Sequence, residues 1–229
     1  MIDAKKIFVG ILVVVVVMSV VITPVSASTL VLNDEGHVEV NMWDKVPNYY
    51  QGDYASTSYG EYGTVASHGC GPTCLAMVGS YIKNEKITPD EVAKEYGGYN
   101  TSGGSSWSLM TDFADDYDIS VEETRDLDEV KDALAKGDVA ISIQTSAGPF
   151  TEGGHFIVLS GLTSDGKIIV NDPNKYNEVK LADGFENGFD DETIEQGSLK
   201  YWIYDAPEKV NPSDLIKKRL KQDLFPLLK

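Results

Sequence analysis

The stretch HGCGPTC, residues 68–74, places the beginning of a helix beside a cysteine. Glycines flank Cys70, and Pro72 suits the first turn of a helix, where its missing N–H costs little. From Thr73 to Ile82, apolar residues recur at three- and four-residue spacings, which predicts a helix. Cys70 would therefore lie at a helix N-terminus, whose N–H groups lower the pKa of a thiol and can face an oxyanion. The alternative for Cys70 alone is a buried structural cysteine in a glycine-rich turn.

Far downstream, a histidine and an aspartate stand at the two ends of a predicted hairpin. His155 begins the β-branched run HFIVLSGL, the residues TSDG supply a turn, and KIIVND returns and ends at Asp172. If a four-residue loop joins the strands, Leu162 faces Lys167 and His155 becomes the diagonal neighbour of Asp172 on the same face. Asp172 could then orient the imidazole, and His155 could take the proton of the Cys70 thiol.

These motifs, together with Gln51 upstream, resemble the bacteriocin-processing (double-glycine) peptidase-like family, a branch of the papain-like cysteine peptidases. The motifs are GCGPTCLAM around Cys70, GGHFIVLSG around His155 and VNDPN around Asp172, and the resemblance extends over residues 47–205. It implies a papain-like fold, in which an N-terminal helical half carrying the nucleophile packs on a C-terminal antiparallel sheet carrying the histidine and the aspartate. It also implies that Cys70 is the nucleophile, that Gln51 donates to the oxyanion hole, and that Cys74 is structural.

The chain departs from the peptidases that remove double-glycine leaders. Those enzymes are usually fused to an exporter with membrane-spanning and nucleotide-binding parts, whereas these 229 residues contain no P-loop and no room for such parts. We therefore expect a stand-alone relative, and the identity of the substrate does not carry over.

The N-terminal residues have the pattern of a secretory signal peptide. Lys5 and Lys6 precede the apolar run from Ile7 to Ile22, and small residues surround Ala27. The run has 16 residues, which is short for a membrane-spanning helix of about 20. We expect cleavage after Ala27 and a secreted protein, with an uncleaved membrane anchor as the alternative. The expected divisions are a signal peptide (1–27), an N-terminal extension (28–46), a papain-like peptidase domain (47–206) and an amphipathic C-terminal tail (207–229).

The charge of the chain limits its partners. A formal net charge of −17 favours solubility and disfavours nucleic acid or an anionic membrane as a partner of the main body. The expected partner is a peptide or protein substrate, with membrane contact only through an uncleaved leader. We expect no cofactor and no metal, because the acidic clusters lack the spacing of a calcium loop and no second Cys/His pair at zinc-ligand spacing accompanies Cys70 and Cys74.

The order of the predicted elements, helices first and strands afterwards, predicts an α+β fold. Thr88 and Glu91 form a capping box that begins a second helix, and Gly137 ends a helix over 127–136. Trp107 is expected in the core rather than in a cleft wall. His68 is expected at the surface or in a loop, too near Cys70 in sequence to be its preferred base. Both cysteines are expected to be free. The other expectations are a loop over 54–67, a helix over 106–117, and strands over 139–144, 155–162, 167–171 and 199–204.

Three functions remain compatible with the sequence. A secreted cysteine peptidase that hydrolyses peptide bonds is the preferred one. The second is a thiol amidase or transpeptidase that acts on cell-wall peptides, and the third is an inactive, peptidase-like extracellular binding module. The presence of Gln51, Cys70, His155 and Asp172 argues against the third, since a binding module needs none of them.

Overall fold

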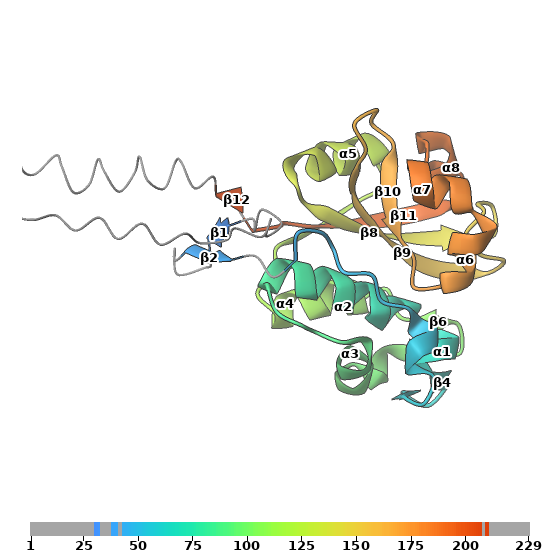
Figure 1. Ribbon diagram of the computed structural model, residues 1–229. Coiled ribbons are helices and arrows are strands. Elements are labelled where there is room, and N and C mark those ends of the chain that lie inside the picture. The colour runs from blue at the N-terminus through green and yellow to red at the C-terminus, as the bar shows by residue number, and fades with distance from the viewer. Residues whose placement is uncertain (1–29, 33–37, 41–42, 208, 211–229) are drawn as a thin grey trace, which may run out of the picture.

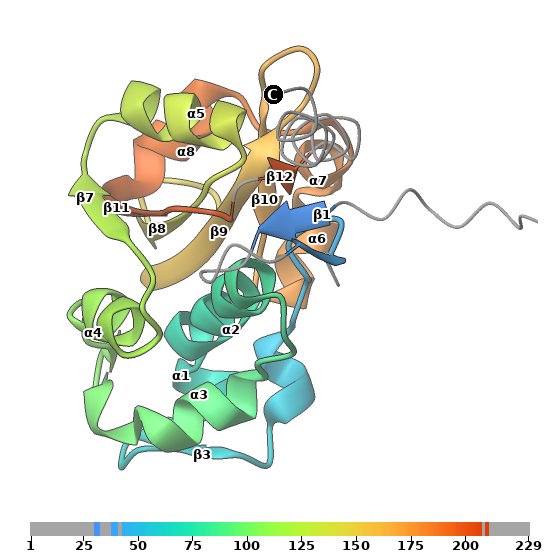
Figure 2. The same cartoon turned by 90° about the vertical axis from the view of Figure 1, so that its left-hand side faces the viewer.

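A computed structural model describes residues 30–32, 38–40, 43–207 and 209–210. Its centre is a five-stranded antiparallel sheet with the strand order β10-β9-β8-β11-β7, covered by helices on both faces (Figures 1 and 2). The chain is thus an α+β protein, as predicted. The strands are β7 (Val121–Thr124), β8 (Val139–Thr145), β9 (Gly154–Leu162), β10 (Ile168–Asn171) and β11 (Ser198–Tyr204).

The first face of the sheet packs on the helical half of the chain, which centres on α2 (Cys70–Lys83). Eleven of the 14 residues of α2 are buried, as expected for a helix that is apolar nearly all round. A continuous apolar cluster joins α2 to β8, β9 and β11 and includes Met77, Phe113, Ile141, Val158 and Trp202. The other elements of this half are η1 (Gln51–Tyr54), β3 (Ser58–Tyr59), β4 (Gly63–Thr64), α1 (Val65–His68), α3 (Pro89–Glu95), η2 (Gly97–Tyr99), β5 (Asn100–Thr101), β6 (Gly104–Ser105) and α4 (Leu109–Asp116).

The second face of the sheet carries α5 (Leu127–Lys136), with α6 (Lys175–Lys180), α7 (Ala182–Asn187) and α8 (Asp191–Gly197) inserted between β10 and β11. A separate apolar cluster lies under these helices and includes Val130, Ile157, Leu159, Ile194 and Tyr201. The strands that carry His155 and lead to Asp172 are therefore held between two packed layers.

A small sheet joins the two ends of the described chain. β1 (Leu30–Leu32) pairs with β2 (Val38–Val40) and also with β12 (Lys209–Val210). In Figure 1 these strands lie at the end of the molecule opposite α1. The predicted signal peptide and most of the C-terminal tail lie outside the described residues. Among those residues, no helix combines the length and the apolar character needed to cross a membrane.

Several elements follow the sequence prediction. Thr88 and Glu91 form the predicted capping box at the start of α3, with the Thr88 N–H donating to Glu91 Oε2 at 2.8 Å. α5 has the predicted bounds, and Gly137 caps it in the left-handed conformation with φ 103°. The two cysteines are free, and Cys74 is fully buried.

Other expectations were wrong. Residues 54–67 are not a loop but contain the β3–β4 hairpin and most of α1, whose N-terminus Thr64 and Ser67 cap. α4 begins at Leu109 rather than at residue 106, whereas α2 begins at Cys70, which confirms the predicted place of this cysteine at a helix N-terminus. β7, α6, α7 and α8 were not predicted, because each is too short for a periodic pattern to stand out.

The register of the β9–β10 hairpin contains two deviations that cancel. Ile168, not Lys167, faces Leu162, so the predicted pairing at the loop was wrong by one residue. A β-bulge at Ser160 then restores the register, and Asn171 faces Val158. One further step along the strands brings Asp172 opposite Ile157, which is the relation that the sequence predicted.

Candidate active site

Cys70 is the first residue of α2 and follows directly on α1 through Gly69. Cys70 as a residue is half-buried, and its thiol is hydrogen-bonded to the side chain of His155. Burial alone would raise the pKa of the Cys70 thiol, but the hydrogen bond and charge of His155 and the backbone N–H groups of Phe156 and Gly71 outweigh it. The pKa of Cys70 is therefore lowered, which favours the nucleophilic thiolate.

His155, the second residue of β9, bridges the thiol and a carboxylate. Its Nε2 lies 2.6 Å from Asp172 Oδ1, which leaves Nδ1 for Cys70. Burial acts to lower the pKa of the imidazole, but the hydrogen bonds and charges of Asp172 and Cys70 raise it to about 10. Imidazolium is consequently the stable form of His155 at neutral pH.

Asp172 follows β10 directly and is fully buried. Besides His155, its Oδ1 accepts a hydrogen bond from the Asn174 backbone N–H at 2.7 Å, and its Oδ2 accepts one from Asn177 Nδ2 at 2.8 Å. The Asn177 amide also donates to Phe150 O at 2.7 Å, and its side chain is buried. Sequence reasoning missed Asn177. Asn177 lies only five residues after Asp172 in the sequence, but helix α6, which directs its side chain back to Asp172, was not predicted.

Gln51 is the first residue of η1 and is held close to the site by its backbone. Its N–H donates to Pro173 O at 2.9 Å, and its Nε2 donates to Ala66 O at 2.8 Å. A side-chain amide has two N–H donors, so one remains beyond the bond to Ala66. Gln51 and His155 line the same pocket, a cavity of about 310 Å³ that also includes Lys175.

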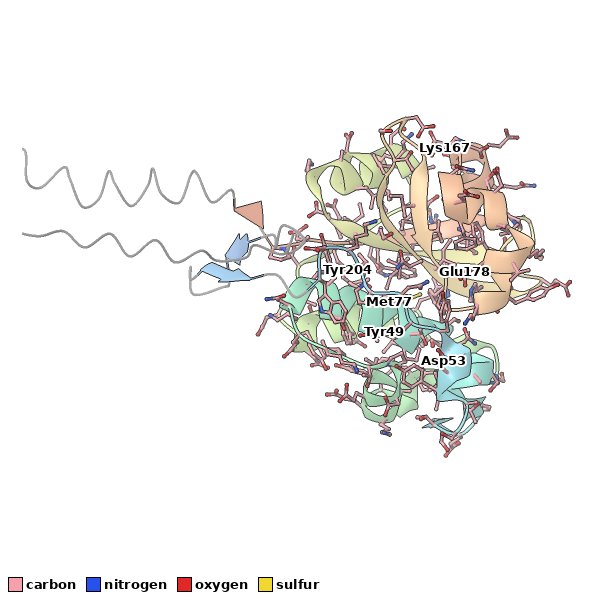
Figure 3. The ribbon with its side chains drawn as sticks, viewed as in Figure 1. Tyr49, Asp53, Met77, Lys167, Glu178 and Tyr204 are labelled. Atoms are coloured by element: carbon pink, nitrogen blue, oxygen red, sulfur yellow. The ribbon has the colours of Figure 1, made fainter. Side chains whose placement is uncertain are left out.

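The segment before Gln51 is tied across the molecule to α6. Tyr50 Oη donates to Glu178 Oε1 at 2.7 Å, and Asn48 Nδ2 donates to the same oxygen at 2.9 Å. Figure 3 shows Tyr49 and Asp53 over the helical half and Glu178 on the sheet half. These bonds link the position of Gln51 to the helix that carries Asn177.

A second cavity, of about 370 Å³, lies at Cys70 and includes His68 and Trp107. Trp107 is 42 % exposed, so its predicted place in the core was wrong. Trp202 fills the interior, and Trp107 packs edge-on against it with ring centroids 6.0 Å apart. His68 is the last residue of the short helix α1 and is half-buried, and its Nδ1 lies 2.9 Å from Ser67 Oγ.

The sequence-predicted residues Cys70, His155 and Asp172 thus form one hydrogen-bonded line, and Gln51 lies in the pocket beside His155. Cys74 takes no part, since burial raises its pKa well above the usual value. Another cavity, of about 630 Å³ between residues 147–149, α7 and α8, includes none of these residues. Among the described residues, no group of three or more His, Cys, Asp or Glu side chains is placed to hold a metal ion.

Comparison with known proteins gives the family of the chain. The chain is similar to a crystal structure from Bacillus anthracis, described as a candidate C39-like peptidase, with 15 % sequence identity over 79 % of this chain and 99 % of that chain. The TM-score of the pair is 0.46. No curated protein matches the chain significantly. Residues 43–200 match the model of the Peptidase_C39 like family, a match that includes all four predicted site residues. The chain therefore belongs to the Peptidase_C39 like family.

Proposed function

We propose that this protein is a cysteine peptidase that hydrolyses peptide bonds with Cys70 as nucleophile, His155 as acid and base, and Asp172 as the group that orients the imidazole. The observation that carries the proposal is the hydrogen-bonded line from the Cys70 thiol through His155 to Asp172. The pKa of the Cys70 thiol is lowered and the pKa of the His155 imidazole is raised, and both shifts favour a thiolate–imidazolium pair. Such a pair is the activated form of a cysteine nucleophile.

In the first half-reaction, the Cys70 thiolate attacks the carbonyl carbon of the scissile bond, and a C–S bond forms. Negative charge then develops on the carbonyl oxygen, where the backbone N–H of Cys70 and the remaining N–H of Gln51 Nε2 act as donors. The His155 imidazolium gives its proton to the departing nitrogen, the C–N bond breaks, and the amine leaves.

In the second half-reaction, a water molecule attacks the thioester that remains on Cys70. Neutral His155 takes a proton from this water, the C–S bond breaks, and the acid product leaves with the thiolate restored. Asp172 stays ionised throughout and keeps Nε2 of the imidazole fixed, so that Nδ1 faces the reacting atoms.

Turnover of peptides and alkylation of thiols test these roles separately. Cys70→Ala and His155→Ala should each remove nearly all peptide hydrolysis, because the members of such a unit act together. Cys74→Ala is the matched control and should retain turnover, because Cys74 is a fully buried residue of the apolar cluster and its raised pKa keeps its thiol protonated. A Cys70→Ala variant that still hydrolyses peptides would contradict the proposal.

Gln51→Ala distinguishes the oxyanion hole from the nucleophile. It should slow turnover by roughly 10²–10³-fold, the effect of removing one oxyanion donor, while Cys70 still reacts with iodoacetamide. Turnover at the wild-type rate would assign the oxyanion to backbone N–H groups alone.

We also propose that the protein acts outside the cell on peptide or protein substrates. The leader pattern of residues 1–27 and the net charge of −17 support this location.

A further inference from the structure

The cavity at Cys70 has no charged walls. Among the described residues that line it, none is Asp, Glu, Lys or Arg, although the chain contains 36 acidic and 19 basic residues. Its apolar walls come from Trp107, Ile143, Phe156 and Leu199. Its volume of about 370 Å³ lies within the range of pockets that hold organic ligands, ~300–1,000 Å³.

Two of these walls are apolar side chains left open to solvent. Trp107 is 42 % exposed and Leu199 is 47 % exposed. Trp107 is supported edge-on by buried Trp202, which also contacts Phe156 with ring centroids 6.0 Å apart. Exposed apolar side chains that cluster in a cavity mark a surface for binding. The aromatic wall is therefore supported from the interior and remains partly open to solvent.

Leu199 owes its position to a local irregularity of β11. In the β11–β8 ladder, Ser198 faces Gln144 and Lys200 faces Ile143, so Leu199 is an extra residue. A bulge of this kind redirects a side chain and is common beside active sites. Here it turns an aliphatic side chain into the cavity that contains Cys70.

The chemistry assigns this cavity to one half of the substrate. His155 has to protonate the departing nitrogen, so the leaving half lies in the pocket that His155 shares with Gln51 and Lys175. The other half becomes attached to Cys70 and extends along the second cavity. That cavity therefore receives a side chain that precedes the scissile bond.

Resting on the proposed function, we propose that this cavity selects a large, uncharged apolar side chain, aliphatic or aromatic, one or two residues before the scissile bond. A glycine at that position would leave the walls formed by Trp107 and Leu199 in water, and a charged side chain would lose hydration in a cavity whose lining contains no Asp, Glu, Lys or Arg. The preferred substrate is thus a peptide with a bulky apolar residue before the cleavage point, not one that ends in paired glycines.

Peptidyl chloromethyl ketones test the preference without requiring turnover. The Cys70 sulfur displaces chloride and forms a thioether, which intact-protein mass spectrometry detects. Matched reagents would carry Leu, Phe, Gly, Asp or Lys at either of the two residues before the reactive carbon. At one of these positions, the reagents that carry Leu or Phe should label Cys70 at least about tenfold faster than those that carry Gly, Asp or Lys, because an apolar pocket usually discriminates between side chains by at least this factor. Equal rates, or fastest labelling by Gly, would overturn the inference.

A charge introduced at Leu199 should change the preference. Leu199→Glu should slow the Leu and Phe reagents and accelerate the Lys reagent, each measured relative to iodoacetamide. Ile169→Glu is the matched control, because Ile169 is 41 % exposed on β10 and lies outside the cavity lining. Trp107→Ala provides a second variant, in which the advantage of Phe over Gly should shrink. If Leu199→Glu behaves like Ile169→Glu and Trp107→Ala leaves the ratio unchanged, the cavity does not select this side chain.

The two proposals fail in different ways. Selective labelling by Leu or Phe reagents with no peptide hydrolysis would contradict the proposed peptidase and leave the apolar pocket standing. Hydrolysis of peptides with no preference at either position would contradict the pocket alone.

Discussion

The carboxylate of Asp172 is fully buried, and its stability depends on neighbours that satisfy its oxygens. A buried charge is tolerated only when it is paired and hydrogen-bonded. His155, the backbone N–H of Asn174 and the amide of Asn177 supply these bonds. Two of the three donors thus come from the turn into α6 and from α6 itself, so this short helix stabilises the ionised form of Asp172.

Asn177→Ala should damage turnover although Asn177 touches no reacting atom. The change removes the donor to Asp172 Oδ2 and the bond to Phe150 O. Loss of a hydrogen bond to a charged group should reduce the free energy of unfolding by about 1.5–3 kcal/mol. Because Asp172 then orients His155 less well, kcat should fall while KM stays near its wild-type value, and the pH dependence of Cys70 alkylation should shift. A lower Tm with unchanged kcat and pH profile would reduce Asn177 to a structural role. Asn187→Ala, which removes an exposed bond to Asp183 in α7, is the control.

The ionisation of Cys70 and His155 predicts the pH dependence of the site. Alkylation by iodoacetamide follows the thiolate, so its rate should reach half-maximum below the usual thiol pKa of 9.0. His155→Ala should move this midpoint upward, because His155 supplies the main influences that lower the pKa of the thiol. Turnover should fall again as the pH rises through about 10, where His155 loses the proton that the leaving group requires. A wild-type alkylation midpoint at or above pH 9 would contradict the activated thiol.

The residues of the hydrogen-bonded line could be predicted because each stands at the boundary of a strongly patterned element. Cys70 precedes an apolar helix, and His155 and Asp172 stand at the ends of a hairpin. Asn177 and Trp107 gave no such signal. An isolated asparagine is typical of turns, and the exposure of Trp107 depends on Trp202 having filled the interior.

At the scale of elements, α2 and the β5–β6 hairpin approach each other closely at the site. A Cβ atom on Gly71 would lie 2.4 Å from Ser105 Oγ and 2.7 Å from Ser105 Cβ. Ser105 is held there by Tyr59, whose Oη lies 2.9 Å from Ser105 Oγ. The glycine after Cys70 therefore allows the hairpin to pack against the start of α2 and to form one rim of the cavity.

Gly71→Ala should destabilise this packing by about 1–3 kcal/mol, the usual cost of an overpacked core. Thermal unfolding measures the effect. The double variant Gly71→Ala with Ser105→Gly should recover part of the loss, because it removes both atoms that the new methyl group would meet. Gly98→Ala is the control, since a Cβ there meets nothing within 4 Å and its Tm should hardly change. Equal Tm values for Gly71→Ala and the wild type would show that the β5–β6 hairpin can move away from α2 without loss of stability.

Elements with caps or long apolar patterns were predictable, and elements defined by tertiary contacts were not. Thr88 and Gly137 marked helix ends by local hydrogen bonding and backbone conformation alone. The four-residue helix α1 and the four-residue strand β7 have too few residues for a period to emerge. The bulges at Ser160 and Leu199 depend on the partner strands and carry no local signature.

At the scale of the whole molecule, the site lies where two independently packed layers meet. Cys70 belongs to the helical half, which forms one apolar cluster with the first face of the sheet. Ile157 and Leu159, which follow His155 in β9, belong to the cluster on the second face. The bonds from Asn48 and Tyr50 to Glu178 cross between the halves and restrain their relative position.

The leader makes a prediction about the whole chain. When the protein is expressed with its leader in a secreting host, the mature form should begin at Ser28, because the small residues before this position suit cleavage after Ala27. N-terminal sequencing and intact mass of the protein from the medium measure this. Protein that keeps Met1 and remains with the membrane fraction would support the uncleaved anchor instead.

The pairing of β1 with β12 determines how the molecule can be attached to a support. Leu30 faces Val210 across this small sheet, so the described part of the chain starts and ends at neighbouring points. In Figure 1 that sheet lies at the end of the molecule away from α1, whereas Cys70 directly follows α1 and Gly69. A protein cut to residues 30–210 and immobilised on beads through either end should therefore present the cavity at Cys70 to the solution and retain access to large protein substrates.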